Sequence, residues 1–204
     1  MAVASVRRNA VIRHVWWATL LGVVFSCAAS ETHRFTNLEY RFSASFPDGN
    51  TVCTAMSGDH PHGFFVRFDS SSLGCSSPTV DPAISAISVY AYSNATFEQT
   101  AEEEVNGLCQ NGSGRDEKIA KDSVTNLAFS GRPSAACEIT RADGSIDIYV
   151  VTQAGKWPQE GGSAGPNAPY VNYTASLHTT PKQLARDLPV FRLVLKSVRI
   201  DYPK

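Results

Sequence analysis

The chain of 204 residues carries 18 Lys and Arg against 19 Asp and Glu, a formal net charge of −1. Three of the basic residues and none of the acidic ones fall in residues 1–30, so residues 31–204 carry 15 against 19, a charge of −4. This mildly acidic balance, with no run of Lys and Arg after Arg13, argues against a nucleic-acid-binding protein. The 174 residues after position 30 are enough for a single domain with a real core.

Residues 1–30 have the three zones of a secretory signal: a positive start, an apolar segment at 15–25 and a run of small residues. The apolar segment is shorter than the about 20 residues of a membrane-spanning helix, and the polar sequence from Glu31 argues against an uncleaved anchor. We therefore expect a periplasmic or secreted protein, cut after Ala29 or Ser30.

The same segment also resembles a bacterial lipobox at 24–27 (Val-Phe-Ser-Cys), in which Cys27 would be acylated and become the new N-terminus. Phe25 is unusual at its place in that motif. An acylated Cys27 would hold the domain at the cell envelope without a spanning helix. A lipoprotein and a soluble mature form therefore both stay open, and a lipid anchor is the only membrane contact we expect.

Without Cys27 the chain has four cysteines, an even number that predicts two disulfides in an exported protein. Three pairings are open. We favour Cys53–Cys75 and Cys109–Cys137, because each bridge stays within one half of the chain. A metal site at these cysteines is disfavoured, because there is no C-x-x-C motif and the spacings are wide.

The first half of the chain predicts a β-hairpin, two further strands and a helix. Apolar residues alternate at 39–46, a turn follows at 47–50, and 51–53 returns as the second arm of the hairpin. Segments 63–68 and 84–92 are strands by the same test. An apolar stripe at helical spacing predicts a helix from Thr96 to Cys109, with Thr96 and Gln99 as a capping box.

The second half predicts mainly antiparallel strands and a last helix. Strands are expected at 126–129, 135–140, 145–152 and 170–178, with an Asp-Gly hairpin turn at 141–144. Residues 154–169 form a long Gly- and Pro-rich loop, which is typical of a functional segment. A final helical region starts at Pro181, and Pro189 is expected to divide it.

Hairpins of this kind predict an α+β domain at 31–204, with helices packed on an antiparallel sheet. Three segments are similar to motifs of the Mog1/PsbP-like α/β/α sandwich family: 40–47 (YRFSASFP) to its opening hairpin, 127–135 (LAFSGRPSA) to its entry into a long hairpin, and 188–199 to its closing helix. This resemblance implies a fold whose members mainly bind other proteins and share no catalytic residues. The disulfides and the 154–169 loop depart from the family pattern.

The densest group of metal-capable side chains is Asp59-His60-Pro61-His62. Two imidazoles two residues apart on an extended chain can bind one ion, and His178 is the candidate for a third ligand. The alternative is a polar turn before the strand at 63–68. His60 and His62 are therefore candidate metal ligands of a small metal-dependent hydrolase.

Two other motifs predict no chemistry. Gly161-Gly162-Ser163-Ala164-Gly165 matches the nucleophile-elbow pattern, but two prolines follow where that motif needs a helix. The carboxylates at 102–104 are neighbours on a helix and point in different directions, which indicates a solvated face. We expect no cofactor.

Tyrosines are frequent near the strand ends, and Trp157 lies in the long loop. Tyr and Trp are favoured at protein interfaces, so Trp157 and Tyr170 are candidate binding residues. The sequence therefore predicts an exported, non-enzymatic protein-binding domain of the bacterial envelope. A narrower version is an immunity- or inhibitor-like protein that neutralises a toxin in the same compartment.

Overall fold

The computed structural model describes residues 32–54, 62–68, 84–94, 100–111, 118–120, 126–129, 131–156 and 170–201. These residues contain ten strands and two helices: β1 (Thr32–Asn37), β2 (Phe42–Pro47), β3 (Thr51–Cys53), β4 (His62–Arg67), β5 (Ala86–Asn94), α1 (Ala101–Asn111), β6 (Lys118–Ala120), β7 (Ala135–Thr140), β8 (Ile146–Lys156), β9 (Tyr170–Thr179), α2 (Leu184–Ser197) and β10 (Arg199–Ile200). No helix in this part of the chain is long and apolar enough to span a membrane. The predicted signal at 1–30 lies outside the described residues.

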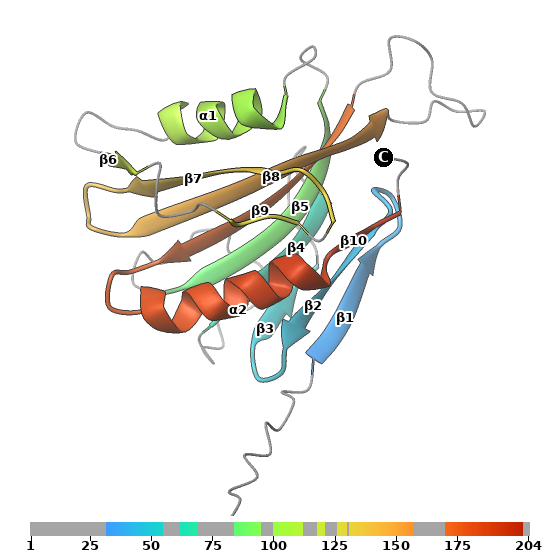
Figure 1. Ribbon diagram of the computed structural model, residues 1–204. Helices are drawn as coiled ribbons and strands as arrows, with labels where there is room; N and C mark the ends of the chain where they lie inside the picture. The colour runs from blue at the N-terminus through green and yellow to red at the C-terminus, as the bar shows by residue number, and fades with distance from the viewer. Residues whose placement is uncertain are drawn as a thin grey trace, which may run out of the picture.

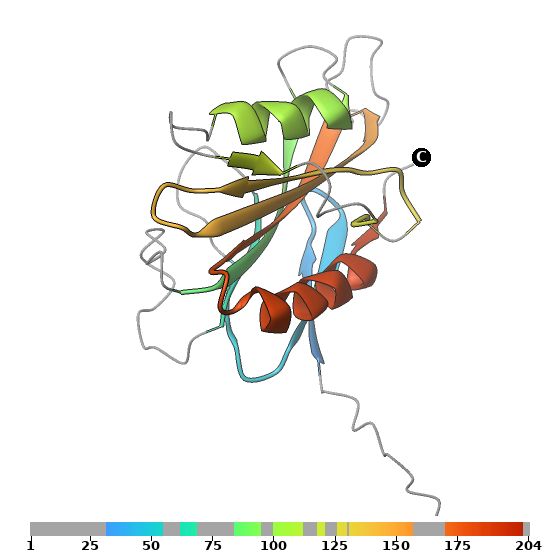
Figure 2. The same ribbon diagram turned by 60° about the vertical axis from the view of Figure 1, so that its left-hand side comes forward.

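The strands form two sheets, and every pairing is antiparallel. Seven strands build the main sheet in the order β3-β4-β5-β9-β8-β7-β6, and β1-β2-β10 form a smaller sheet. The two helices cover opposite faces of the main sheet, and the small sheet lies on the same side as α2 (Figures 1 and 2). The expected α+β class, an antiparallel sheet with helices packed on it, is confirmed.

The first predicted hairpin is wrong. Segment 42–47 (β2) pairs with β1 and β10, whereas 51–53 (β3) pairs with β4 in the other sheet. The turn at 47–50 therefore carries the chain between sheets, with Gly49 at a φ of +82° that favours glycine. The alternation indicated correctly which residues are buried, but it cannot name a partner strand, and β1 was missed because it is mostly exposed.

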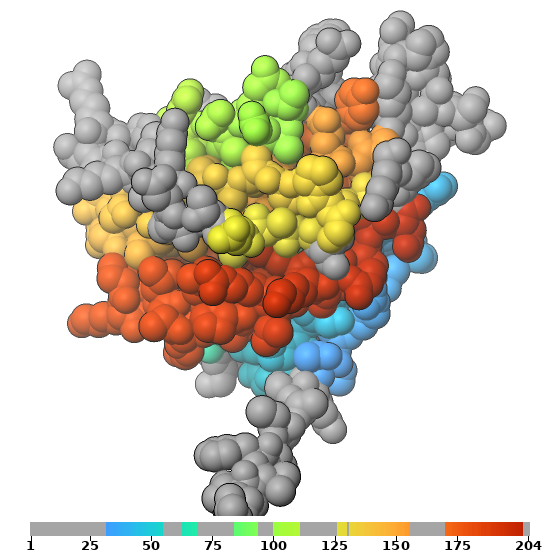
Figure 3. Space-filling model, viewed as in Figure 1, coloured from blue at the N-terminus to red at the C-terminus, as the bar shows by residue number. Residues whose placement is uncertain are grey.

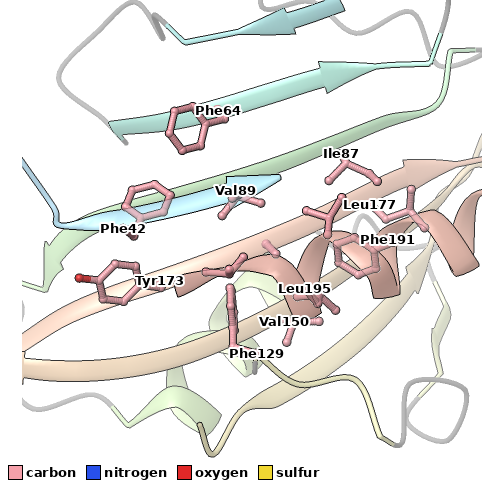
Figure 4. Packing of buried hydrophobic residues seen from close by; sticks show 14 of the residues in the cluster. Phe42, Phe64, Ile87, Val89, Phe129, Val150, Tyr173, Leu177, Phe191 and Leu195 are labelled. Carbon is pink, nitrogen blue, oxygen red and sulfur yellow. The ribbon is translucent and has the colours of Figure 1, made fainter. Parts of the chain in front are cut away.

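The larger core lies between the main sheet, the small sheet and α2. Phe42 of β2 packs against Phe64 of β4 and Tyr173 of β9, with ring centroids 5.3 and 5.6 Å apart (Figure 4). From the α2 side, Phe191 and Leu195 close this core. The three elements therefore form one packed unit whose apolar faces are mutually buried.

Helix α2 is continuous from Leu184 to Ser197, so the expected division at Pro189 is wrong. Proline has no backbone N–H, so the carbonyl four residues earlier in a helix loses its hydrogen-bond donor. Here that residue is Ala185, and both Ala185 and Pro189 are exposed, so water can replace the missing donor. At the start of the helix, the fully buried Asp187 accepts a hydrogen bond from the Thr179 hydroxyl at 2.7 Å, which ties α2 to the end of β9.

Helix α1 packs on β7 and β8 through a second, smaller core of Val105, Cys109, Cys137, Ile139 and Val151. The predicted capping box is misplaced. Thr100 and Glu103 form it instead: the Thr100 hydroxyl accepts from the Glu103 amide at 3.2 Å, and the Glu103 carboxylate accepts from the Thr100 amide at 2.8 Å. The Thr-x-x-Gln pattern at 96–99 falls on residues outside the described part of the chain.

A disulfide joins Cys109 of α1 to Cys137 of β7, as the favoured pairing predicts, with their Cα atoms 6.5 Å apart. Cys53 of β3 is buried and disulfide-bonded. Its expected partner Cys75 and the lipidation candidate Cys27 lie outside the described residues. The Cys53–Cys75 bridge therefore stays a prediction.

Two further expectations about the second half need correction. Residues 127–129 form no strand: Leu127 and Phe129 are buried in the larger core, but they sit on an irregular segment. Strand β8 continues to Lys156, past the expected start of the long loop, because it pairs with β9 as far as Tyr170. The Asp-Gly turn is confirmed, with Gly144 at a φ of +84° between β7 and β8.

Candidate functional site

The face of the main sheet that carries α1 presents four tyrosines, Tyr90 and Tyr92 of β5, Tyr149 of β8 and Tyr170 of β9. We call this group the tyrosine face. Successive residues of a strand point to opposite sides. The core-facing side of β9 includes Val171 and Tyr173, and the alternation therefore places Tyr170 on the α1 side. Tyr149 packs against the smaller core under α1.

Close backbone packing positions Tyr90. Gly63 of β4 pairs directly with Tyr90. A β-carbon at Gly63 would lie 2.2 Å from the Val89 carbonyl oxygen and 2.8 Å from Cβ of Tyr90. Only glycine fits at position 63, because the backbone of β5 comes this close to β4 at Tyr90.

Tyr90 and Tyr92 form a stacked pair, with ring centroids 6.2 Å apart and an interplanar angle of 27°. The hydroxyl of Tyr92 donates a hydrogen bond to the carboxylate of Glu104 on α1. This contact fixes the N-terminal half of α1 against the end of β5. On the neighbouring strand β9, Asn172 and Thr174 are fully buried, and their backbones pair with those of Tyr92 and Tyr90.

The electrostatics keep both phenols protonated. Burial is the main cause that raises the pKa of Tyr90, and the nearby Tyr149 adds to it. Burial also raises the pKa of Tyr92, followed by its hydrogen bond to Glu104. In the physiological range the tyrosine face therefore offers neutral hydroxyl groups and aromatic rings beside one carboxylate. Rings and neutral phenols of this kind can pack against, and hydrogen-bond to, another molecule.

A second polar cluster lies toward the other end of the same face. Asp147 of β8 hydrogen-bonds through one carboxylate oxygen to Nδ1 of His178 and through the other to Nε of Arg141, at 2.6 Å each. Arg141 also donates to the Tyr149 hydroxyl at 3.4 Å. Burial by itself raises the pKa of Asp147, but the bonds from His178 and Arg141 outweigh it and lower the pKa below the usual aspartate value. This cluster braces the β7–β8 turn.

Of the predicted metal ligands, His178 is the one whose side chain the structure describes. His178 is engaged by Asp147. The backbone of His62, the first residue of β4, pairs with Ala91, and His60 lies outside the described residues. Among the described residues, no group of three His, Cys, Asp or Glu side chains is arranged to hold a metal ion.

Of the two predicted binding residues, Tyr170 is half-buried at the start of β9, where it pairs with Asn94 and Lys156. Trp157 follows Lys156 directly and, like Ser163, lies outside the described residues. Glu104 was not expected to belong to the site. Glu102 and Glu103 are exposed as expected, but Glu104 is half-buried against Tyr92. Its spacing of four residues from Leu108 on the packed side of α1 was the available signal.

Comparison with known proteins shows the class of fold. No family model matches the chain, and no curated protein matches it in sequence. A solved structure is similar to it in fold: the solution structure of cyanobacterial PsbP (CyanoP) from Synechocystis sp. PCC 6803, with a TM-score of 0.50 and 14% identity, over 88% of this chain and 98% of that chain.

The chain therefore has a PsbP-like fold, as the motifs at 40–47, 127–135 and 188–199 suggested. At this level of identity the likeness extends to the fold alone, because function depends on individual sites grafted on a fold.

Proposed function

We propose that this is an exported protein-binding domain, without catalytic activity of its own, that uses the tyrosine face against a protein partner in the periplasm or cell envelope. The observation that carries the proposal is the gathering of four tyrosines from three adjacent strands on one sheet face. Aromatic residues are enriched at protein interfaces, and tyrosine provides a large contact area with few rotatable bonds to immobilise.

Three further features support the proposal. The start of the chain resembles a secretory signal. The Cys109–Cys137 bridge is typical of an exported protein. The Tyr92 hydroxyl donates its proton to Glu104, which leaves the remaining lone pairs of both groups as acceptors for polar contacts beside the aromatic rings. An immunity- or inhibitor-like role, in which the partner is a toxin of the same compartment, is the narrower form of this proposal.

The proposal is tested by affinity capture from envelope extract, followed by titration of the purified captured protein against single variants. Tyr170→Ala should weaken binding at least tenfold, the effect of removing an aromatic anchor. Leu38→Ser, at an 84% exposed side chain of the β1–β2 turn, is the matched control and should bind as the parent does. Equal affinities for the parent and the Tyr170→Ala variant would show that the partner docks elsewhere.

The competing function is a small metal-dependent hydrolase centred on His60 and His62. It predicts stoichiometric zinc on the purified protein and loss of that zinc in a His60→Ala/His62→Ala double variant. Elemental analysis of the two proteins distinguishes the functions. Bound zinc that is lost in the double variant would refute the proposal of a non-enzymatic domain, whether or not Tyr170→Ala weakens binding of a partner.

A further inference from the structure

Helix α2 and the turn before it expose a row of basic side chains. Lys182, Arg186, Arg192 and Lys196 are all exposed, and their spacings of four, six and four residues place them along the outward side of the helix. We call these four residues the basic ridge. The one acidic residue of the segment 181–199 is Asp187, which is fully buried. Every charged side chain that α2 exposes is therefore basic.

Most of this charge is not neutralised by neighbours. Arg186 pairs with Asp187 at 2.7 Å. Within the described part of the chain, Lys182, Arg192 and Lys196 form no ion pair. The ridge thus stands out in a domain whose overall charge is −4, and α1, on the opposite face of the main sheet, carries Glu102, Glu103 and Glu104 and no basic residue.

The basic surface continues onto the small sheet. Arg199 of β10 donates to the carbonyl of Lys196 at 3.0 Å and pairs with Ser43 of β2. Arg34 of β1 donates to the Ser43 hydroxyl at 2.5 Å from the other side of that strand. Two arginines are therefore fixed beside the C-terminal end of the ridge.

Helix α2 lies at the surface of the molecule. Figure 3 shows it in view along its length as a band across the lower part of the molecule. From Lys182 to Lys196 the band is about 21 Å long at 1.5 Å per residue. Leu193, with 62% of its surface exposed, lies on the same exposed side of the helix. The exposed positions of α2 include no aromatic residue.

We propose that the basic ridge docks on an anionic lipid surface, separately from the tyrosine face on the other side of the main sheet. Clustered Lys and Arg bind anionic headgroups without needing a complementary pocket, and an exposed Leu among them can enter the boundary of the acyl chains. A protein interface of this size is instead typically rich in aromatic residues and poor in Lys. The composition of the ridge therefore favours the lipid surface.

The test is co-sedimentation of the exported, processed protein with vesicles. A Cys27→Ala background removes any acyl group, so that only the folded surface is measured. The vesicles are phosphatidylglycerol with phosphatidylcholine in equal parts, or phosphatidylcholine alone, at 0.1 M salt. The protein should prefer the anionic vesicles, and the Lys182→Gln/Arg192→Gln/Lys196→Gln variant should lose on the order of a hundredfold in partitioning, about fivefold per residue.

Two controls test whether binding depends on where the charge lies and on its sign, and not only on the net charge of the protein. Lys196→Gln and Asn106→Glu each lower the net charge by one unit, but Asn106 is exposed on α1, so only Lys196→Gln should weaken binding. Lys182→Arg/Lys196→Arg keeps the charge and should bind as the parent does. Circular dichroism should be unchanged in all variants, because the substituted side chains are exposed.

Equal binding to both kinds of vesicle, or an unchanged preference in the triple variant, would overturn the proposal. The proposal would also be overturned if the protein bound no vesicles and an acidic protein bound the parent but not the triple variant. The basic ridge would then be a protein-binding surface. Binding to the tyrosine face is read from Tyr170→Ala, so the two surfaces can fail independently.

Discussion

Asp147 shows how one side chain sets part of the acid stability of this fold. Its carboxylate accepts from His178 and Arg141, and these bonds lower its pKa although burial opposes them. A carboxyl group with a lowered folded-state pKa stabilises the protein above the unfolded-state value of about 3.9, and this stability is lost as the pH falls through the folded-state pKa. Asp147→Asn should therefore lower the free energy of unfolding by about 1–3 kcal/mol at pH 7.

The same substitution should change the shape of the acid limb. Between pH 5 and pH 2 the parent loses the contribution of Asp147, and Asp147→Asn, which has nothing to lose there, should show a shallower decline. Urea unfolding of both proteins across this range measures the difference. Parallel curves would mean that the Asp147 bonds contribute no pH-dependent stability.

The stacked tyrosines make the opposite prediction at alkaline pH. Because burial raises the pKa of Tyr90 and Tyr92, the folded state holds these protons more tightly than the unfolded state. Their stabilisation is complete below the unfolded-state value of about 10 and declines as the pH rises above it. In absorbance titration at 295 nm, both should ionise only with unfolding. Tyr92→Phe should reduce that step by one tyrosine, whereas an unchanged step would contradict the burial of Tyr92.

At the scale of elements, α1 depends on a small core and on one covalent bond. The bridge between Cys109 and Cys137 closes a loop of 28 residue steps, which corresponds to a stabilisation on the order of 3 kcal/mol. The Cys109→Ser/Cys137→Ser variant should lose about this amount in urea unfolding. Hydrogen exchange should speed up first in α1, because among the described residues the helix is then held on the sheet by Val105 with its few neighbours and by the Tyr92–Glu104 hydrogen bond. Equal protection of α1 in both proteins would show that packing alone secures it.

The elements also show what the sequence can and cannot predict. Periodicity identified the buried faces of β2, β5 and β9, because alternation reports burial directly. Strand partners were harder. The arms at 42–47 and 51–53 look like a hairpin in sequence, yet they belong to different sheets, since pairing is decided by tertiary packing. The strands β1, β6 and β10 were missed because each is short or mostly exposed, and so leaves no apolar pattern.

The candidate site was predictable only in part, for the same reason. The tyrosines near strand ends pointed to an aromatic surface, but Glu104 joins it only because α1, packed on β7 and β8, brings this carboxylate to Tyr92 at the end of β5. The basic ridge was not foreseen. Its residues are spread over fifteen positions of sequence and become a continuous surface only once α2 turns its apolar side, including Phe191 and Leu195, to the core.

At the scale of the whole molecule, the two sides of the main sheet have different chemistry: tyrosines and an acidic helix on one, a basic helix on the other (Figure 1). An acylated Cys27 and a basic surface would be two separate attachments to the membrane, and two attachments hold a domain there more stably than either alone. If Cys27 is acylated, five residue steps lead from the anchor to Thr32 at the start of β1, a span of at most about 18 Å. The domain would then stay at the lipid surface, where α2 can reach it.

Processing at Cys27 therefore decides whether anchor and ridge act together. The motif at 24–27 predicts a mature protein that begins at an acylated Cys27, and Cys27→Ala should then release the protein into the soluble fraction, apart from what the ridge alone retains. Cleavage after Ala29 or Ser30 predicts an unacylated protein for which Cys27→Ala changes nothing. Intact-mass measurement of the processed protein separates the outcomes: an N-terminus at Ser30 or Glu31 would end the lipoprotein hypothesis and leave the basic ridge as the only membrane contact. Phe25 fits the lipobox poorly and the small residues at 28–30 suit an ordinary signal peptidase, so we expect the soluble form.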